Sequence, residues 1–252
     1  MWRAASRALL DLLFAPHCAA CGREAWEAAE PDALCLSCAA RVEPLQARCE
    51  RCGRRAGPLG GVRGCLRCAA EHWPVEGIVA GQSYRGVPRE LVVALKFRAR
   101  ARAAQALARW LALSLEARAL PGDLLVPVPL SHRRLATRGF NQAEVLARHV
   151  GAALHVPLDA QALQRTRHGP PQSAQRPGQR RRGARGAFTA LPGRVQGRCV
   201  IVVDDVLTSG ATALACAHAL ARAGAAAVVL AAACRSEGHP GARRQDELLA
   251  RA

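Results

Sequence analysis

The sequence predicts an α/β fold, in which a doubly wound parallel sheet follows a small cysteine-rich module. From Gly77 onward, short apolar runs rich in β-branched residues alternate with segments of helical periodicity. This is the order of strands and crossover helices in a parallel sheet. Before that point, eight of the eleven cysteines fall into Cys-x-x-Cys pairs. We therefore expect a cysteine module at 1–72, an α/β domain at 77–236 and a polar tail at 237–252.

The cysteine pairs have the spacing of zinc ligands. The gaps between the partner pairs are 13 and 12 residues, which suits two tetrahedral four-cysteine ribbons in series. A cross-braced pairing, first pair with third, fits the spacing equally well. A disulfide framework is the rival interpretation, but it needs an export signal, and Asp11 interrupts the only short apolar patch near the N-terminus. The predicted ligands are Cys18, Cys21, Cys35, Cys38, Cys49, Cys52, Cys65 and Cys68.

The sequence indicates the function of this module less clearly than it indicates zinc binding. It has few large apolar residues, so we expect it to need zinc in order to fold. Residues 1–76 carry ten arginines against nine acidic residues, and each zinc held by four thiolates adds net negative charge. A net negative module favours docking of partner proteins, or a hood over a neighbouring site, rather than the main nucleic-acid contact.

Between the module and the tail, the pattern alternates between strands and helices. Pro88 suits the start of a helix, and Asn141 with Glu144 forms a capping box before another. Gly224 suits a helix C-cap. Strands are expected at 77–84, 124–128, 200–203 and 227–234, and helices at 88–97, 101–119, from 141 and 210–224.

The most informative stretch runs from Val200 to Thr212. Four β-branched residues predict a strand buried on both faces, which we expect to stop at Asp204 and Asp205. A run of small and hydroxylated residues follows before a helix begins near Ala211. Backbone N–H groups and the helix dipole favour a phosphate at such a junction, and adjacent carboxylates suit ribose hydroxyls or a Mg²⁺ ion that accompanies a polyphosphate. An ordinary strand–helix turn carrying two acids is the simpler alternative.

This stretch resembles the phosphoribosyl pyrophosphate (PRPP) loop of the type I phosphoribosyltransferase fold. By that resemblance, Asp204 and Asp205 are catalytic residues that hold the ribose hydroxyls. The 5′-phosphate would lie against the segment that follows, and Mg²⁺ would arrive with PRPP. The residues implied for the phosphate are Thr208, Ser209, Gly210, Ala211 and Thr212.

Further segments resemble the ComF family of competence-associated proteins, whose members also begin with a double zinc ribbon. They are Leu95–Arg98, Pro127–Leu130 and Arg138–Ala143. The resemblance implies an enzyme or PRPP-binding protein linked to DNA uptake in the cytoplasm, with competence proteins as possible partners of the zinc module. It also implies a pyrophosphate-side set, for which solvated surface charges are the alternative: Lys96, Arg133, Arg134 and Arg138.

The segment from Arg165 to Arg185 is the densest part of a strongly basic domain. Residues 77–252 carry 26 basic residues against ten acids, and this segment holds seven arginines and no acid. Such a segment attracts polyanions. It could form a mobile lid over pyrophosphate, an arm that binds single-stranded DNA, or a solvated run without a partner. Nothing in the sequence identifies an acceptor for a transferred phosphoribosyl group, and no apolar run is long enough to insert into a membrane.

Overall fold

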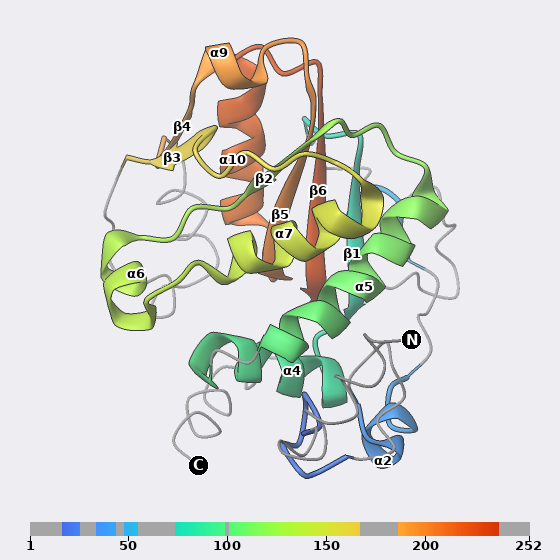
Figure 1. Ribbon diagram of the computed structural model, residues 1–252. Helices are drawn as coiled ribbons and strands as arrows, with labels where there is room; N and C mark the ends of the chain where they lie inside the picture. The colour runs from blue at the N-terminus through green and yellow to red at the C-terminus, as the bar shows by residue number, and fades with distance from the viewer. Residues whose placement is uncertain are drawn as a thin grey trace, which may run out of the picture.

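A four-stranded parallel sheet forms the centre of the protein (Figure 1). The computed structural model describes residues 17–25, 34–43, 48–54, 74–98, 101–166 and 186–236. Every pairing in the sheet is parallel, as predicted. The strand order is β1 (Gly77–Ser83), β6 (Ala227–Arg235), β5 (Cys199–Leu207) and β2 (Leu124–Pro127).

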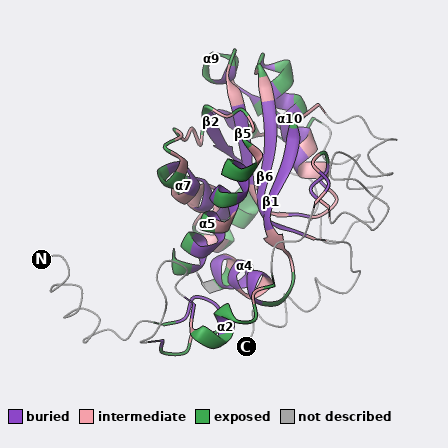
Figure 2. Ribbon diagram, turned by 90° about the vertical axis from the view of Figure 1, so that its right-hand side faces the viewer, coloured by how far each residue is buried: buried purple, intermediate pink, exposed green. Residues whose placement is uncertain are grey.

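Helices cover both faces of this sheet, and alternate strand residues enter different cores. Val203 packs with the helices of one face, whereas its neighbour Val202 packs with α10 on the other. Figure 2 shows the strands buried between the two layers. The first face carries α4 (Gly86–Arg98), α5 (Ala101–Arg118) and α7 (Gln142–Leu154), and the second carries α10 (Ala211–Arg222) with the hairpin β3 (Leu163–Arg165) and β4 (Phe188–Ala190).

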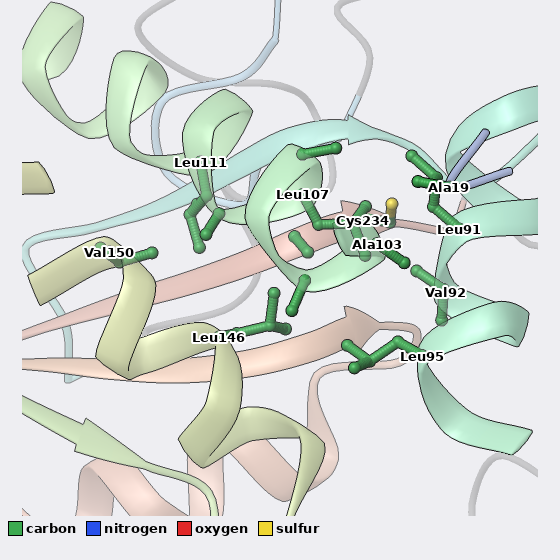
Figure 3. Close-up of a cluster of buried hydrophobic side chains, with 14 of the residues drawn as sticks. Ala19, Leu91, Val92, Leu95, Ala103, Leu107, Leu111, Leu146, Val150 and Cys234 are labelled. Atoms are coloured by element: carbon green, nitrogen blue, oxygen red, sulfur yellow. The ribbon is translucent and has the colours of Figure 1, made fainter. Parts of the chain in front are cut away.

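Close packing on the first face depends on small residues and well-capped helices. A Cβ atom on Gly81 of β1 would lie 2.9 Å from the backbone nitrogen of Leu111, so only glycine lets α5 approach so closely. Leu107 and Leu111 of α5 are fully buried and meet Leu146 of α7 in one cluster (Figure 3). Asn141 caps α7 by accepting a hydrogen bond from the Ala143 N–H, as the capping pattern predicts.

The first cysteine ribbon packs against α4. Ala19, Leu34 and Cys38 belong to the same buried cluster as Leu91 of α4, and the short helix α2 (Leu36–Ala39) lies beside α4 in Figures 1 and 2. An ion pair of 2.7 Å between Arg41 and Glu90 adds to this contact. The ribbon and the α/β domain therefore share a core.

Both edges of the sheet are covered by other segments. At the β1 edge, the Ile78 N–H donates to the Glu50 carbonyl oxygen at 3.4 Å. Glu50 belongs to the turn that holds Cys49 and Cys52, which we call the second cysteine knuckle. At the β2 edge, the Leu125 N–H donates to the Pro157 oxygen at 2.8 Å, and the Asp159 N–H donates back to the Leu125 oxygen at 2.9 Å. Covered edges leave few backbone groups open to pairing with another chain.

Five elements differ from the sequence-based expectation. Strand β5 continues through Asp204 and Asp205 to Leu207, because β6 runs alongside and keeps pairing with it. The helix α6 (His132–Arg138) and the β3–β4 hairpin were not predicted, and α9 (Pro192–Val195) is a single short turn. Within the described ranges, no helix has the length and apolarity needed to cross a bilayer.

Candidate functional site

The two predicted carboxylates lie near the carboxyl end of the central strand β5. Asp204 pairs in register with Ala232 of β6, and the strand ends three residues later at Leu207. The Asp205 N–H donates to Asp204 Oδ1 at 2.8 Å, and the Val206 N–H donates to Asp205 Oδ1 at 2.7 Å. Ligands of open parallel sheets bind at this edge, so the carboxylates stand where the fold class places a site.

The two carboxyls differ in their protonation because they have different neighbours. Burial, together with repulsion from Asp205, raises the pKa of Asp204 well above its usual range. Burial also acts to raise the pKa of Asp205, but the Lys96 ammonium, 2.7 Å from Asp205 Oδ2, outweighs it and leaves that pKa lowered. When the pair takes up a proton, Asp204 is therefore the carboxyl that binds it, and Asp205 keeps its charge.

The segment after β5 presents a helix N-terminus without a side-chain cap. Gly210 takes the left-handed conformation, with φ +79°, and precedes α10 at the N-cap position. Ser131 and Asn141 cap α6 and α7 with their side chains, whereas the N-cap residue of α10 is a glycine and has no side chain to do so. The Ser209 hydroxyl accepts a hydrogen bond from the Ala211 N–H at 3.4 Å. The flanking residues Thr208, Ser209, Ala211 and Thr212 are half-buried.

Cations from two helices surround the carboxylates. Lys96 comes from the C-terminal turn of α4, and Arg138 comes from the end of α6. The Arg138 guanidinium lies 5.3 Å from the centroid of the Phe97 ring and donates to Gln142 Oε1 at 3.0 Å. Burial lowers the pKa of Arg138, the charge of Asp205 opposes this, and the charge of Arg134 lowers it further. The structure thus places Lys96 and Arg138 at the carboxylates, with Arg134 acting on Arg138 through its charge, whereas Arg133 and Arg134 both have exposed side chains on α6.

Arg165, the first residue of the basic segment for which the sequence left a lid over pyrophosphate, a DNA-binding arm and a solvated run open, lies on the hairpin. Arg165 ends β3, and its guanidinium stacks 5.2 Å from the centroid of Phe188 on β4. Burial, followed by the positive charge of Arg134, lowers its pKa, and both Arg165 and Asp204 act electrostatically on Cys216 of α10. Arg134 and Arg165 therefore lie close enough for their charges to interact. The sequence signal that could have revealed this hairpin is the alternation of apolar and polar residues at Leu163 and at Phe188–Ala190. The rest of the basic segment, 167–185, lies outside the described residues.

The first two cysteine pairs form one metal-binding geometry. The Sγ atoms of Cys18, Cys21, Cys35 and Cys38 all lie within 4.8 Å of one another, which favours sequential pairing over cross-bracing for this site. A hydrogen bond with the Ser37 hydroxyl, helped by the Cys38 backbone N–H, lowers the pKa of Cys35 to about 6. The group thus fits a zinc ion, which takes thiolates in tetrahedral geometry.

The second knuckle repeats the backbone of the first. The Cys49 N–H donates to the Arg54 oxygen at 2.8 Å, as the Cys18 N–H does to the Arg23 oxygen, also at 2.8 Å. Both turns end in a glycine with positive φ. Cys49 and Cys52 are buried together, and their predicted partners Cys65 and Cys68 lie outside the described residues.

The fold and these two sites define a phosphoribosyltransferase-fold protein with an N-terminal zinc-ribbon module. Residues 9–72 match the family described as Double zinc ribbon domain, and residues 135–249 match the Phosphoribosyl transferase domain family. The chain is 36% identical over 209 residues to the DNA utilization protein YhgH of Escherichia coli (strain K12), covering 81% of this chain and 90% of that one. It is 33% identical over 92 residues to Competence protein F of Haemophilus influenzae, covering 36% of this chain and 40% of that one. The chain belongs to the ComF family.

Solved structures give looser similarities. The glutamine PRPP amidotransferase from B. subtilis, complexed with ADP and GMP, matches with a TM-score of 0.39 and 24% identity, covering 54% of this chain and 27% of that one. Adenine phosphoribosyltransferase from Leishmania donovani matches with a TM-score of 0.33 and 18% identity, covering 54% and 53%. The fold assignment rests on the strand order and the family matches.

Proposed function

We propose that the carboxyl edge of the sheet binds PRPP together with Mg²⁺. The observation that carries this proposal is the contrast between the two halves of the site. One half pairs Asp205 with Lys96 at 2.7 Å, and the other is the N-terminus of α10, whose N-cap residue is the left-handed Gly210. A ligand with a sugar between a phosphate and a pyrophosphate matches that order of groups.

Each half has a defined task in this proposal. Asp205, charged, accepts a hydrogen bond from one ribose hydroxyl. Asp204 accepts a hydrogen bond from the other, and in its protonated form it can also donate a hydrogen bond. The 5′-phosphate occupies the segment 208–212, where the dipole of α10 favours an anion. Lys96, Arg134 and Arg138 take the pyrophosphate side, with Arg133 at its rim.

Transfer of the phosphoribosyl group would follow from positioning and charge. The bond between C1′ and the pyrophosphate oxygen breaks, pyrophosphate leaves with its electrons, and a nucleophilic acceptor bonds to C1′. Arginines and Lys96 stabilise the departing anion, while the charge of Asp205 faces the positive sugar. Mg²⁺ supplies charge neutralisation on the pyrophosphate.

Calorimetry tests the binding proposal directly. Asp204→Asn and Asp205→Asn should each weaken binding of PRPP with Mg²⁺ by about ten- to a hundredfold, because charge-assisted hydrogen bonds contribute roughly 1.5–3 kcal/mol. Asp159→Asn is the matched control, since Asp159 is half-buried and pairs at 2.7 Å with Arg194, which does not belong to the site. A double variant that binds PRPP as well as the wild type overturns the assignment of the carboxylates.

Handling of single-stranded DNA is the second candidate function, and two observations favour it. Relatives carry the names DNA utilization protein and Competence protein F, and the positive charge of the chain lies almost entirely after residue 76. In this proposal the protein acts in the cytoplasm, DNA contacts the segment Arg165–Arg185, and the zinc module docks competence proteins.

Two measurements separate the candidates. DNA binding should fall steeply with salt because phosphate contacts release counterions, and it should survive the double substitution of Asp204 and Asp205. PRPP-dependent release of pyrophosphate in the presence of nucleobases or nucleic acid favours transfer. Binding of DNA without any pyrophosphate release favours the binding module.

A further inference from the structure

The side chain of Arg48 connects the second cysteine knuckle to the carboxyl end of strand β1. Arg48, directly before Cys49, donates from Nη1 to the Gly53 carbonyl oxygen at 2.9 Å. From Nη2 it donates to Ser83 Oγ at 2.8 Å. Ser83 is the last residue of β1. The guanidinium thus ties the knuckle backbone to the end of the edge strand, with two donors in a fixed fork.

A row of paired residues continues from Ser83 across the sheet to the phosphate segment. Ser83 pairs with Arg235 of β6, and Arg235 pairs with Leu207 of β5. The Tyr84 N–H donates to the Arg235 oxygen at 2.9 Å. The fully buried Arg235 side chain donates from Nη1 to the Leu207 oxygen at 3.4 Å. Leu207 immediately precedes Thr208, the first residue of the segment 208–212.

We infer that Arg48 and Arg235 are positioning residues for the 5′-phosphate half of the site. The segment 208–212 consists of small residues and enters α10 through a glycine with positive φ, so few side chains of its own can fix its direction. Its direction is set instead by the strand end before it, which Arg235 holds and which Arg48 ties to the zinc knuckle. This inference rests on the proposed function, because it assigns the phosphate to that segment.

The pyrophosphate half is supported separately. Lys96 belongs to α4, which packs on the first ribbon and α5, and Arg138 belongs to α6 and stacks on Phe97. Although α4 begins three residues after Ser83, Lys96 lies in its C-terminal turn, and Arg138 comes from a different segment of the chain. A change at Arg48 should therefore affect one half of the site and spare the other, whereas general destabilisation would weaken both.

Calorimetry on the full-length, zinc-loaded protein separates the halves with two probes, ribose 5-phosphate and inorganic pyrophosphate. Arg48→Met and Ser83→Ala should each weaken ribose 5-phosphate binding by about tenfold, the effect of one lost hydrogen bond, and leave pyrophosphate binding unchanged. The double variant should be no weaker than either single one, because both remove the same contact. Arg235→Lys, which keeps the charge, should show the same selectivity.

Arg118→Met is the matched control. Arg118 donates to the Glu50 oxygen of the same knuckle at 3.3 Å, but it comes from the C-terminal turn of α5 and lies beside Gly77, at the opposite end of β1. It should leave both affinities unchanged, with the zinc content equal in all variants. Unchanged ribose 5-phosphate binding in Arg48→Met, or equal loss of both ligands, overturns the inference. A wild type that binds neither probe overturns the proposed function itself.

Discussion

Asp204 and Asp205 should have opposite effects on stability, although they are adjacent and chemically identical. Asp205→Asn leaves the Lys96 ammonium without its charge partner in a region where the two side chains are only 19% and 8% exposed. Breaking a fully buried pair costs roughly 3–5 kcal/mol. Lys96 can recover some hydration, so we expect a loss of about 2–3 kcal/mol. For a protein of this size that lowers the melting temperature by roughly 4–12 °C.

Asp204→Asn should raise the melting temperature instead. Burial and the charge of Asp205 raise the pKa of Asp204, so ionising this carboxyl costs free energy in the folded state and an amide removes that cost. Functional carboxylates of this kind are often replaced with a gain of stability. We expect about 1 kcal/mol, or roughly 2–4 °C.

The difference in stability between each variant and the wild type depends on pH, and its direction follows from the pKa shift of the replaced carboxyl. A raised folded-state pKa means that the wild type loses stability as pH rises from about 4, the unfolded value for aspartate, through the folded pKa of Asp204. The lowered pKa of Asp205 contributes stability above about pH 4, and this is lost as pH falls through the folded pKa. Thermal unfolding followed by circular dichroism should therefore show opposite shifts near pH 7 that shrink toward acid. Shifts of the same sign near pH 7 would refute the assigned protonation.

Three further predictions concern other parts of the molecule. Cys18→Ser should lose one zinc ion per chain in metal analysis and lower the melting temperature of the whole protein, because the first ribbon shares a core with the α/β domain; an unchanged melting temperature would contradict that shared core. Gly81→Ala should cost about 1–3 kcal/mol by overpacking in denaturant titrations, while Gly193→Ala, whose Cβ would meet nothing within 4 Å, should lie within about 1 kcal/mol of wild type; equal costs would speak against the close approach. Arg165→Met should weaken pyrophosphate binding several-fold in calorimetry, whereas Arg148→Met, in an exposed helical ion pair, should not; equal affinities would remove Arg165 from the site.

The sequence predicted the features that depend on local pattern. The β-branched run at 200–203 specifies a buried strand, and Asn141 specifies a helix start through its own side-chain oxygen. Small residues after adjacent acids marked the segment 208–212 as a phosphate candidate. Each of these signals lies within a few neighbouring residues, which is why periodicity and capping chemistry could detect them.

Contacts between distant segments could not be predicted in this way. Lys96 and Asp205 meet only because α4 ends beside the carboxyl edge of β5. The three-residue strands β3 and β4 are too short for a reliable alternation, so the place of Arg165 was not visible. Nothing in the cysteine spacing shows which outer surface of a ribbon packs on α4 or on the β1 edge.

The covered edges of the sheet limit how copies of this chain could assemble. The knuckle at Glu50 bonds to β1 at Ile78, and the segment 157–159 pairs with β2, so a second molecule would have to displace these segments in order to continue the sheet. Otherwise self-association would have to use helix surfaces, where side-chain packing rather than backbone pairing sets the geometry. Removal of zinc would open only the β1 edge to pairing, because the cysteine knuckle lies against β1 and not against β2. A metal-depleted sample should then form aggregates enriched in intermolecular β-structure, with β1 at the growing edge.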